Sequence, residues 1–116
     1  MVKKGSFEWF EHLPCSLIVC DRKYRILYMN ERAVRDRAGD GGEKLVGTDL
    51  MDCHPPEAQA KLRKVLASGL PNVYTSETEG KKKLVYQCPW RQGRRVGGLV
   101  QLVIELPKAL PNHRRH

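Results

Sequence analysis

The sequence predicts an α+β fold, in which a five-stranded antiparallel sheet carries short helices on one face and a helical segment precedes the first strand. Three observations lead to this prediction. Two apolar runs joined by a short polar stretch lie near the N-terminus, an amphipathic stretch follows in the middle, and three strand-like runs separated by glycine-containing turns complete the chain. Strands that follow one another through tight turns pair as antiparallel neighbours, and their helices pack on one side of the sheet.

Length and composition are those of a single folded domain. The chain has 116 residues, of which 41% are hydrophobic and 29% are charged, a composition that supports one core. No apolar stretch approaches the roughly 20 residues that span a bilayer, and the first residues lack the pattern of a signal peptide. The irregular spacing of the four cysteines, Cys15, Cys20, Cys53 and Cys88, indicates reduced thiols, and we expect a cytoplasmic protein.

The first elements are predicted from local signals. Residues 7–13 (FEWFEHL) form the expected helical segment, with Ser6 as its N-cap, and residues 1–6 before it are expected to be frayed. The runs 16–21 (SLIVCD) and 25–29 (RILYM) are expected to pair as a β-hairpin.

Two helices are expected after the hairpin. Asn30 is a suitable N-cap for a short helix that ends at Gly39. From Pro56 to Gly69 the apolar positions follow the spacing of one helical stripe, and both end residues suit their places. Three strands are then predicted at about 72–79, 83–90 and 95–106.

The net charge of +8 raises the question of nucleic-acid binding. In a three-strand meander, Lys81–Lys83 and Arg91–Arg95 fall at opposite ends of the sheet, about a strand length apart. A third basic cluster lies in residues 107–116, which we expect to form a frayed tail. Because no stripe of basic and aromatic residues emerges, we expect solvated turns and not a nucleic-acid groove.

With this order of elements, the chain resembles a PAS domain, the small sensory module of bacterial signalling proteins. The resemblance covers residues 7–106 and rests on three fragments in order: SLIVCDRKYRILYMNERAV, LVGTDLMDCHPPEAQAKLRKVLASG and KKKLVYQCPWRQGRRVGGLVQLVIE. The Cys-His-Pro-Pro sequence is similar to that of a subset of such domains. Two features depart from the family pattern. Tyr24 stands in the first hairpin turn where glycine is usual, and the last strand ends in Ile-Glu-Leu-Pro instead of Asp-Ile-Thr.

The resemblance implies a non-enzymatic sensor with a pocket between the sheet and the helices. That pocket would hold a small metabolite or haem; the ligand is not identified. The Asn-Cys-Arg-Phe-Leu sequence of flavin-photochemical members is absent, which argues against flavin–cysteine photochemistry. Few residues follow the last strand, so the signal is expected to leave through a partner protein or a dimer surface.

Candidate ligand-contacting residues surround the start of the long helix and the presumed pocket: His54, Cys53, Met51, Cys20 and Cys88. Neutral imidazole binds haem iron, so His54 is the candidate metal ligand; the alternative is that it only marks the start of the helix. Buried cysteines are commonly plain apolar side chains, although Cys20, Cys53 and Cys88 could converge at the pocket. Cys53 and His54 are not expected to form a catalytic dyad, because neighbours in extended backbone point in opposite directions.

The last strands are apolar on much of both faces, so the outer face needs a cover. We expect a homodimer through the outer sheet face and the N-terminal segment. The alternative function is a ligand-free interaction or dimerisation domain, in which side chains fill the core completely.

Overall fold

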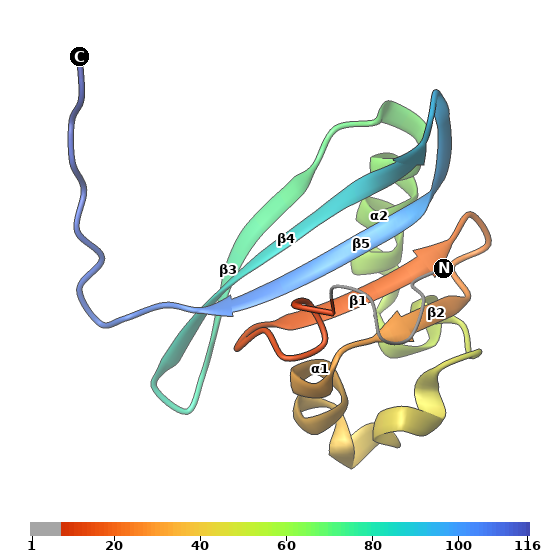
Figure 1. Cartoon of the computed structure of the whole chain (residues 1–116), viewed down its shortest axis with the longest axis horizontal. Coiled ribbons are helices and arrows are strands. Elements are labelled where there is room, and N and C mark those ends of the chain that lie inside the picture. Colours follow the sequence, from red (N-terminus) through yellow and green to blue (C-terminus); the bar gives the residue numbers. More distant parts are fainter. Residues whose placement is uncertain (1–7) are drawn as a thin grey trace.

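The computed structural model describes residues 8–116, so the predicted frayed residues 1–6 and the Ser6 cap lie outside it. Its five strands form one antiparallel sheet in the order β2-β1-β5-β4-β3 (Figure 1). The elements in chain order are β1 (Ser16–Asp21), β2 (Ile26–Met29), α1 (Glu31–Asp36), the 3-10 helices η1 (Ala38–Asp40), η2 (Gly42–Leu45) and η3 (Leu50–Cys53), α2 (Pro56–Ser68), β3 (Asn72–Thr78), β4 (Lys81–Gln92) and β5 (Arg95–Glu105). The predicted α+β fold with five antiparallel strands is confirmed.

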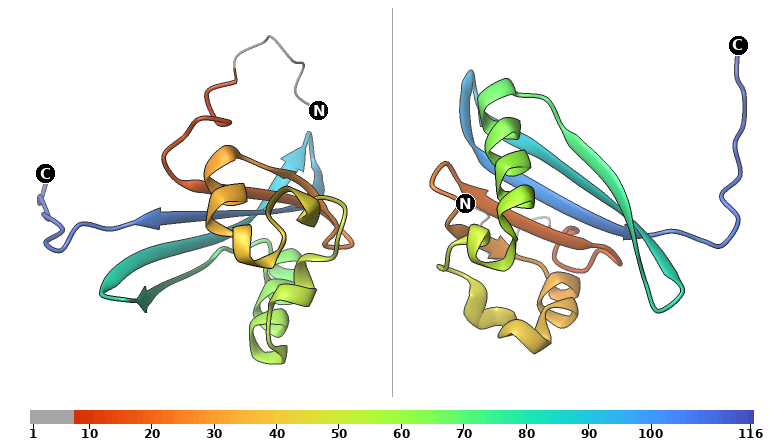
Figure 2. Two further views of the ribbon diagram at one scale, coloured as in Figure 1. Left: turned by 90° about the horizontal axis from the view of Figure 1, so that it is seen from below. Right: turned by 180° about the vertical axis from the view of Figure 1, so that it is seen from behind.

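One face of the sheet, here called the inner face, packs against the helices (Figure 2). The core combines sheet residues with residues from α1, η3 and α2: Ile18, Cys20, Ile26, Met29, Ala33, Leu50, Met51, Leu62, Val65 and Leu99. Residues 8–13 lie on the opposite, outer face, and residues 106–116 extend away from the body without helix or strand (Figures 1 and 2). Within residues 8–116, no helix has the length and apolar character to cross a membrane.

The predicted N-terminal helical segment does not form in the described part of the chain. Residues 9–12 adopt turns, in which Glu11 N–H donates to Glu8 O at 3.1 Å and Leu13 N–H donates to Phe10 O at 3.4 Å. These are contacts between residues three apart and not a helical ladder. The prediction of a helical segment is therefore wrong for residues 8–13, because distant residues determine the backbone path here.

Asn30 is the residue that determines this path. Its fully buried side chain makes four hydrogen bonds. The Nδ2 group donates to Phe10 O and Cys15 O, both at 2.9 Å, and Oδ1 accepts from Leu17 N–H and Ala33 N–H, both at 3.0 Å. Asn30 is thus the predicted cap of α1, and it also holds the N-terminal segment against β1.

The turn between β1 and β2 explains how a tyrosine occupies a position where glycine is usual. Tyr24 has a φ of 65°, in the left-handed region. The Asp21 carboxylate stabilises the turn by accepting hydrogen bonds from the backbone N–H groups of Lys23 (2.8 Å) and Arg25 (3.0 Å). β2 begins one residue later than predicted, at Ile26.

Both predicted helices form at their expected start signals. α1 is shorter than predicted, because it ends at Asp36 and the chain tightens into η1 before Gly41. α2 starts with Pro56 in its first turn and ends where Gly69 adopts a left-handed φ of 75°. This turn directs the chain from the end of α2 into β3.

β4 and β5 are the longest strands. Near the turn that joins them, a tryptophan of β4 is hydrogen-bonded to β1. The Trp90 indole N–H donates to Cys20 O at 2.9 Å, so the ring reaches across β5 to β1. It can do so because the chain has Gly97 and Gly98 in between; a Cβ on Gly97 would lie 2.2 Å from the Trp90 ring.

Candidate ligand-binding groove

His54 lies at the junction between η3 and α2, where its ring is hydrogen-bonded to the backbone. Nδ1 lies 2.9 Å from Leu50 O. A carbonyl oxygen only accepts, so this contact requires a proton on Nδ1, and in the neutral ring Nε2 then carries the lone pair. Gln59 Nε2 donates to His54 O (2.9 Å) and Met51 O (3.0 Å), which ties the first turns of α2 to the end of η3.

Met51 and Cys20 are both part of the core. Met51 is 6% exposed and Cys20 is 1% exposed. Burial raises the pKa of the Cys20 thiol from 9.0 to about 11. Cys20 is therefore a neutral thiol at physiological pH, with the character of a small apolar side chain.

The cysteines do not converge at one pocket. Cys20 pairs with Leu99, whereas Cys88 pairs with the next residue of β5, Val100. Successive residues of a strand point to opposite faces, so Cys20 is on the inner face and Cys88 is on the outer face. Burial raises the pKa of the Cys88 thiol as well. Cys53 is half-buried at the end of η3.

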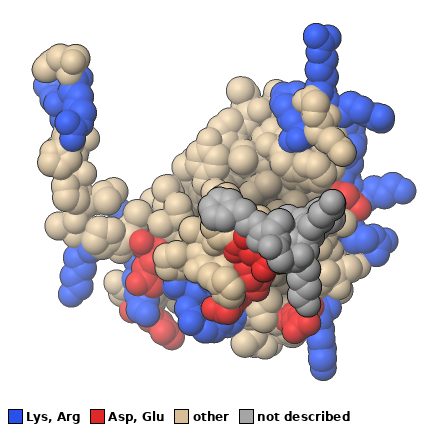
Figure 3. Space-filling view, viewed as in Figure 1, with Lys and Arg blue, Asp and Glu red and all other residues tan. Residues whose placement is uncertain are grey.

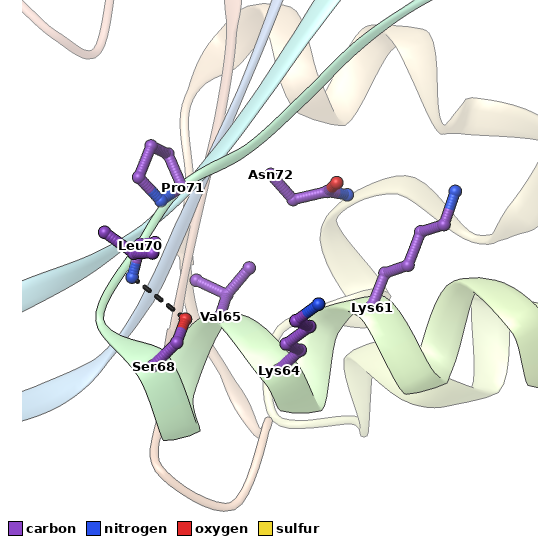
Figure 4. Close-up of a pocket in the computed structure, with 7 residues that line it drawn as sticks. All are labelled: Lys61, Lys64, Val65, Ser68, Leu70, Pro71 and Asn72. Carbon is purple, nitrogen blue, oxygen red and sulfur yellow. Dashed lines mark hydrogen bonds between the residues drawn. The ribbon is translucent and has the colours of Figure 1, made fainter.

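A groove runs between α2 and the start of β3, and it contains none of the five predicted site residues. It consists of two adjoining hollows of about 320 and 260 Å³ that share Lys61 and Asn72. Lys64 and Ser68 also line the first, the lysine hollow (Figure 4). Tyr74 and Gln87 line the second, the amide hollow. Together they are called the α2–β3 groove.

The groove exists because the chain leaves α2 in a tight turn and then diverges from it. Ser68 Oγ accepts a hydrogen bond of 3.1 Å from Leu70 N–H at this corner (Figure 4). Leu70 and Pro71 then lead into β3, whose first residue, Asn72, points back toward α2 (Figure 4). The side chains of α2 and the sheet therefore face each other across the groove.

Three amide side chains form a continuous ladder across the inner face. Asn72, Gln87 and Gln101 occupy one register row of β3, β4 and β5. Asn72 Nδ2 donates to Gln87 Oε1 at 2.8 Å, and Gln87 Nε2 donates to Gln101 Oε1 at 2.8 Å. Gln87 is 2% exposed and Gln101 is 4% exposed, so the ladder runs from the groove into the interior.

The charges of the groove are unevenly distributed. Neither Lys61 nor Lys64 has a carboxylate within 4.0 Å among residues 8–116. Glu57 is the acidic residue that lines the amide hollow, and none lines the lysine hollow. The lysine hollow thus presents two ammonium groups, a hydroxyl and an amide without a balancing negative charge.

A second groove, the outer groove, lies on the other face of the sheet. Its volume is about 310 Å³, and its lining is apolar and aromatic: Phe10, Leu17, Val19, Leu27, Tyr28, Trp90 and Val100. Phe10 packs edge-to-face on Tyr28, with ring centroids 5.6 Å apart. The Tyr28 hydroxyl donates to the Glu11 carboxylate, and burial together with this hydrogen bond raises the pKa of Tyr28.

The basic side chains of the outer face lie in separate clusters. Figure 3 shows Lys and Arg mainly at the margins of this face and along the C-terminal tail, with Asp and Glu side chains nearer its middle. Lys81 begins β4 and Arg91 lies near its end, so the two basic clusters are separated by the strand, as the sequence predicts. We retain the prediction that the chain does not bind nucleic acid.

Sequence reasoning missed Lys61, Asn72, Gln87 and Gln101. The signal for the two glutamines was present, because each is a polar residue among apolar residues on the same face of its strand. A buried amide needs a partner, so two such residues on neighbouring strands indicate a contact. Lys61 gave no signal, since lysines on an amphipathic helix usually face solvent.

Sheet, helices and groove define a class of protein: a small α+β domain with a groove between the helical layer and an antiparallel sheet. Comparison with known families assigns it further. The family described as PAS fold matches residues 10–106. The chain belongs to this family.

Solved structures share the fold at low sequence identity. The PAS domain of the histidine kinase ThkA is 18% identical, with a TM-score of 0.64, and the match covers 78% of this chain and 97% of that one. The Aer2 receptor of Vibrio cholerae, a dual PAS-haem oxygen sensor, is 15% identical, with a TM-score of 0.64 and coverage of 80% and 95%. VqmA of Vibrio cholerae, in complex with a ligand and DNA, is 15% identical, with a TM-score of 0.70 and coverage of 91% and 52%. No curated protein matches the chain.

Proposed function

We propose that the chain is a non-catalytic sensory module that binds a small molecule in the α2–β3 groove and signals through a dimer or a partner protein. The observation that carries this proposal is the amide ladder. A buried amide costs free energy unless its hydrogen-bonding capacity is used. The ladder ends at Asn72, which lines both hollows of the groove and retains free donor and acceptor capacity there.

The similar structures support a sensory role. Aer2 is an oxygen sensor, and the solved VqmA complex includes a ligand. Both share the fold of this chain, and in this chain the space between helix and sheet remains open at the α2–β3 groove.

A ligand screen tests the proposal. We expect at least one compound of a metabolite library to raise the melting temperature by about 5 °C at saturating concentration. Asn72→Ala should weaken that binding, whereas Ser76→Ala, on the same face of β3 but outside the groove, should not. A library without effect, combined with native mass spectrometry that shows no bound molecule in protein purified from cells, would disprove ligand binding.

The predicted role of His54 in haem binding is tested on the same purified protein. Nε2 carries the lone pair that would coordinate iron. Haem bound through His54 would give a Soret band that is lost in His54→Ala. Absence of this band after reconstitution with haem would rule out haem binding through His54. The α2–β3 groove would then remain the proposed ligand site.

Dimerisation through the outer face is the second part of the proposal. The solved VqmA structures include a dimer, and the outer groove and its surroundings are apolar in this chain. Tyr86 on the outer face is 36% exposed, and Tyr74 on the inner face is 40% exposed. Tyr86→Lys should shift the chain to a monomer in analytical ultracentrifugation, and Tyr74→Lys should not. A monomeric wild-type chain at high concentration would contradict the dimer.

A ligand-free dimerisation domain is the alternative function, and one observation favours it. Ile26, Leu62 and Leu99 are each at most 2% exposed, so side chains fill the centre of the core. This function would give a dimer that Tyr86→Lys dissociates and a negative ligand screen.

A further inference from the structure

We infer that the α2–β3 groove selects small organic anions, whose carboxylate or phosphate group lies between Lys61 and Lys64 in the lysine hollow. This inference rests on the proposed function, since it names the chemical class of the ligand for the same groove. It concerns a part of the groove that the predicted site residues do not reach.

The lysine hollow is lined by donors. Lys61 and Lys64 contribute ammonium groups from successive turns of α2, and Asn72 faces them from β3 (Figure 4). Asn72 uses one of its two N–H groups in the ladder, so the other is available. Ser68 Oγ accepts from Leu70 N–H, which leaves its own hydrogen free to donate.

No negative charge within the hollow compensates the two ammonium groups. The acidic residue of the groove, Glu57, lies in the amide hollow, where it makes no ion pair with Lys61 within 4.0 Å. An anion therefore gains two ion pairs in addition to hydrogen bonds, whereas a neutral molecule of the same shape gains only hydrogen bonds from the same ammonium groups. Val65, Leu70 and Pro71 add apolar surface for a short carbon chain.

The amide hollow accommodates the rest of the molecule. Tyr74, Gln87 and the shared Asn72 offer hydrogen bonds at the end of the groove away from Lys64. Gln87 is held in place by both neighbours of the ladder. The groove thus fits a molecule with an anionic end and a polar, uncharged or weakly basic end, the latter near Glu57.

Matched probes test the inference by NMR titration of the ¹⁵N-labelled chain. Succinamate, with one carboxylate and one amide, represents carboxylates, and glycerol 3-phosphate represents phosphates; succinamide and glycerol are their neutral counterparts. We expect saturable shifts of the backbone amides of Ser68, Leu70 and Asn72 with at least one anion, and the anion that binds identifies the source of the charge. Its neutral counterpart should bind at least about tenfold more weakly.

Charge-neutralising variants locate the anion. Lys61→Gln and Lys64→Gln should each raise the Kd about tenfold. Arg63→Gln is the matched control, because it removes the same charge from the same helix, and the Arg63 guanidinium contacts Gln59 instead of lining the groove. It should change the Kd less than twofold. Circular dichroism of each variant checks that the fold is retained.

The outcomes separate the two proposals. Equal binding of an anion and its neutral counterpart, or equal effects of Arg63→Gln and Lys64→Gln, would overturn anion selection and leave ligand binding in the groove standing. No saturable response to either anion would also overturn the inference, while the metabolite screen decides the proposed function independently.

Discussion

The Trp90 indole nitrogen lies 2.9 Å from the backbone oxygen of Cys20, with the whole of β5 between the two strands that carry them. This contact is made over two glycines, Gly97 and Gly98. The tryptophan therefore joins three strands at one end of the sheet, and it also forms one wall of the outer groove.

Gly98→Ala should destabilise the fold. A Cβ at Gly98 would lie 1.9 Å from Cys20 O, and the residue has a φ of +159°. Backbone atoms cannot move aside as a flexible side chain can. We therefore expect the free energy of unfolding, measured in urea, to fall by about 3 kcal/mol. Gly39→Ala is the control, since a Cβ there has no neighbour within 4 Å; equal stability of both variants would contradict the prediction.

Asn30→Ala should be among the most damaging single substitutions. It removes four hydrogen bonds and leaves the N–H of Leu17 and the carbonyls of Phe10 and Cys15 without their partner. We expect a loss of about 3 kcal/mol and faster proteolysis of the N-terminal segment. Asn30→Asp retains the oxygen that accepts from Leu17 and Ala33 but loses the N–H groups that hold the N-terminal segment. It should therefore speed proteolysis of that segment with a smaller loss in free energy of unfolding. Unchanged proteolysis in both would show that other contacts hold the segment.

Stability should fall at high pH because of Cys20. The folded state holds the thiol proton to a pKa of about 11, against an ordinary value of 9.0. Above pH 9 unfolding therefore releases a proton, and stability decreases by up to about 1.4 kcal/mol per pH unit until the folded thiol also ionises. Cys20→Ala has no thiol to ionise at this position. The difference in free energy of unfolding between wild type and this variant should therefore become smaller between pH 9 and 11. A constant deficit over this range would contradict the raised pKa.

The amide ladder should show strong non-additivity. Gln87→Leu leaves the amides of Asn72 and Gln101 without their partner, and we expect a loss of about 2 kcal/mol. The double variant Gln87→Leu, Gln101→Leu removes both buried members and should cost less than the sum of the two single changes. A double-mutant cycle by urea unfolding measures the coupling. Additive effects would mean that the two amides do not depend on each other.

Much of the fold could be predicted because its signals are local. The β1–β2 hairpin, α2 between Pro56 and Gly69, and the three C-terminal strands each have their own periodicity and turn residues. The prediction of a helix in the N-terminal segment was wrong because the decisive contact is not local. Its backbone groups bind Asn30, and no pattern within residues 7–13 reveals a partner that lies so far along the chain.

The candidate site was harder to predict, because it depends on register. Cys20 and Cys88 are both in apolar strands, yet the pairing of β1, β5 and β4 places them on opposite faces. The same register brings Asn72, Gln87 and Gln101 into one row. Alternation within a strand gives the face of each residue relative to its neighbours, but only the pairing between strands decides which side chains meet.

The three amides of the ladder donate in one direction, from Asn72 through Gln87 to Gln101. Their dipoles therefore add, and each hydrogen bond polarises the next in an interior of low dielectric. A change of charge at the sheet's edge beside Asn72 would therefore alter the polarisation of Gln87 and Gln101 through these two hydrogen bonds. The row of amides thus couples the edge strand β3 electrostatically to the middle strand β5.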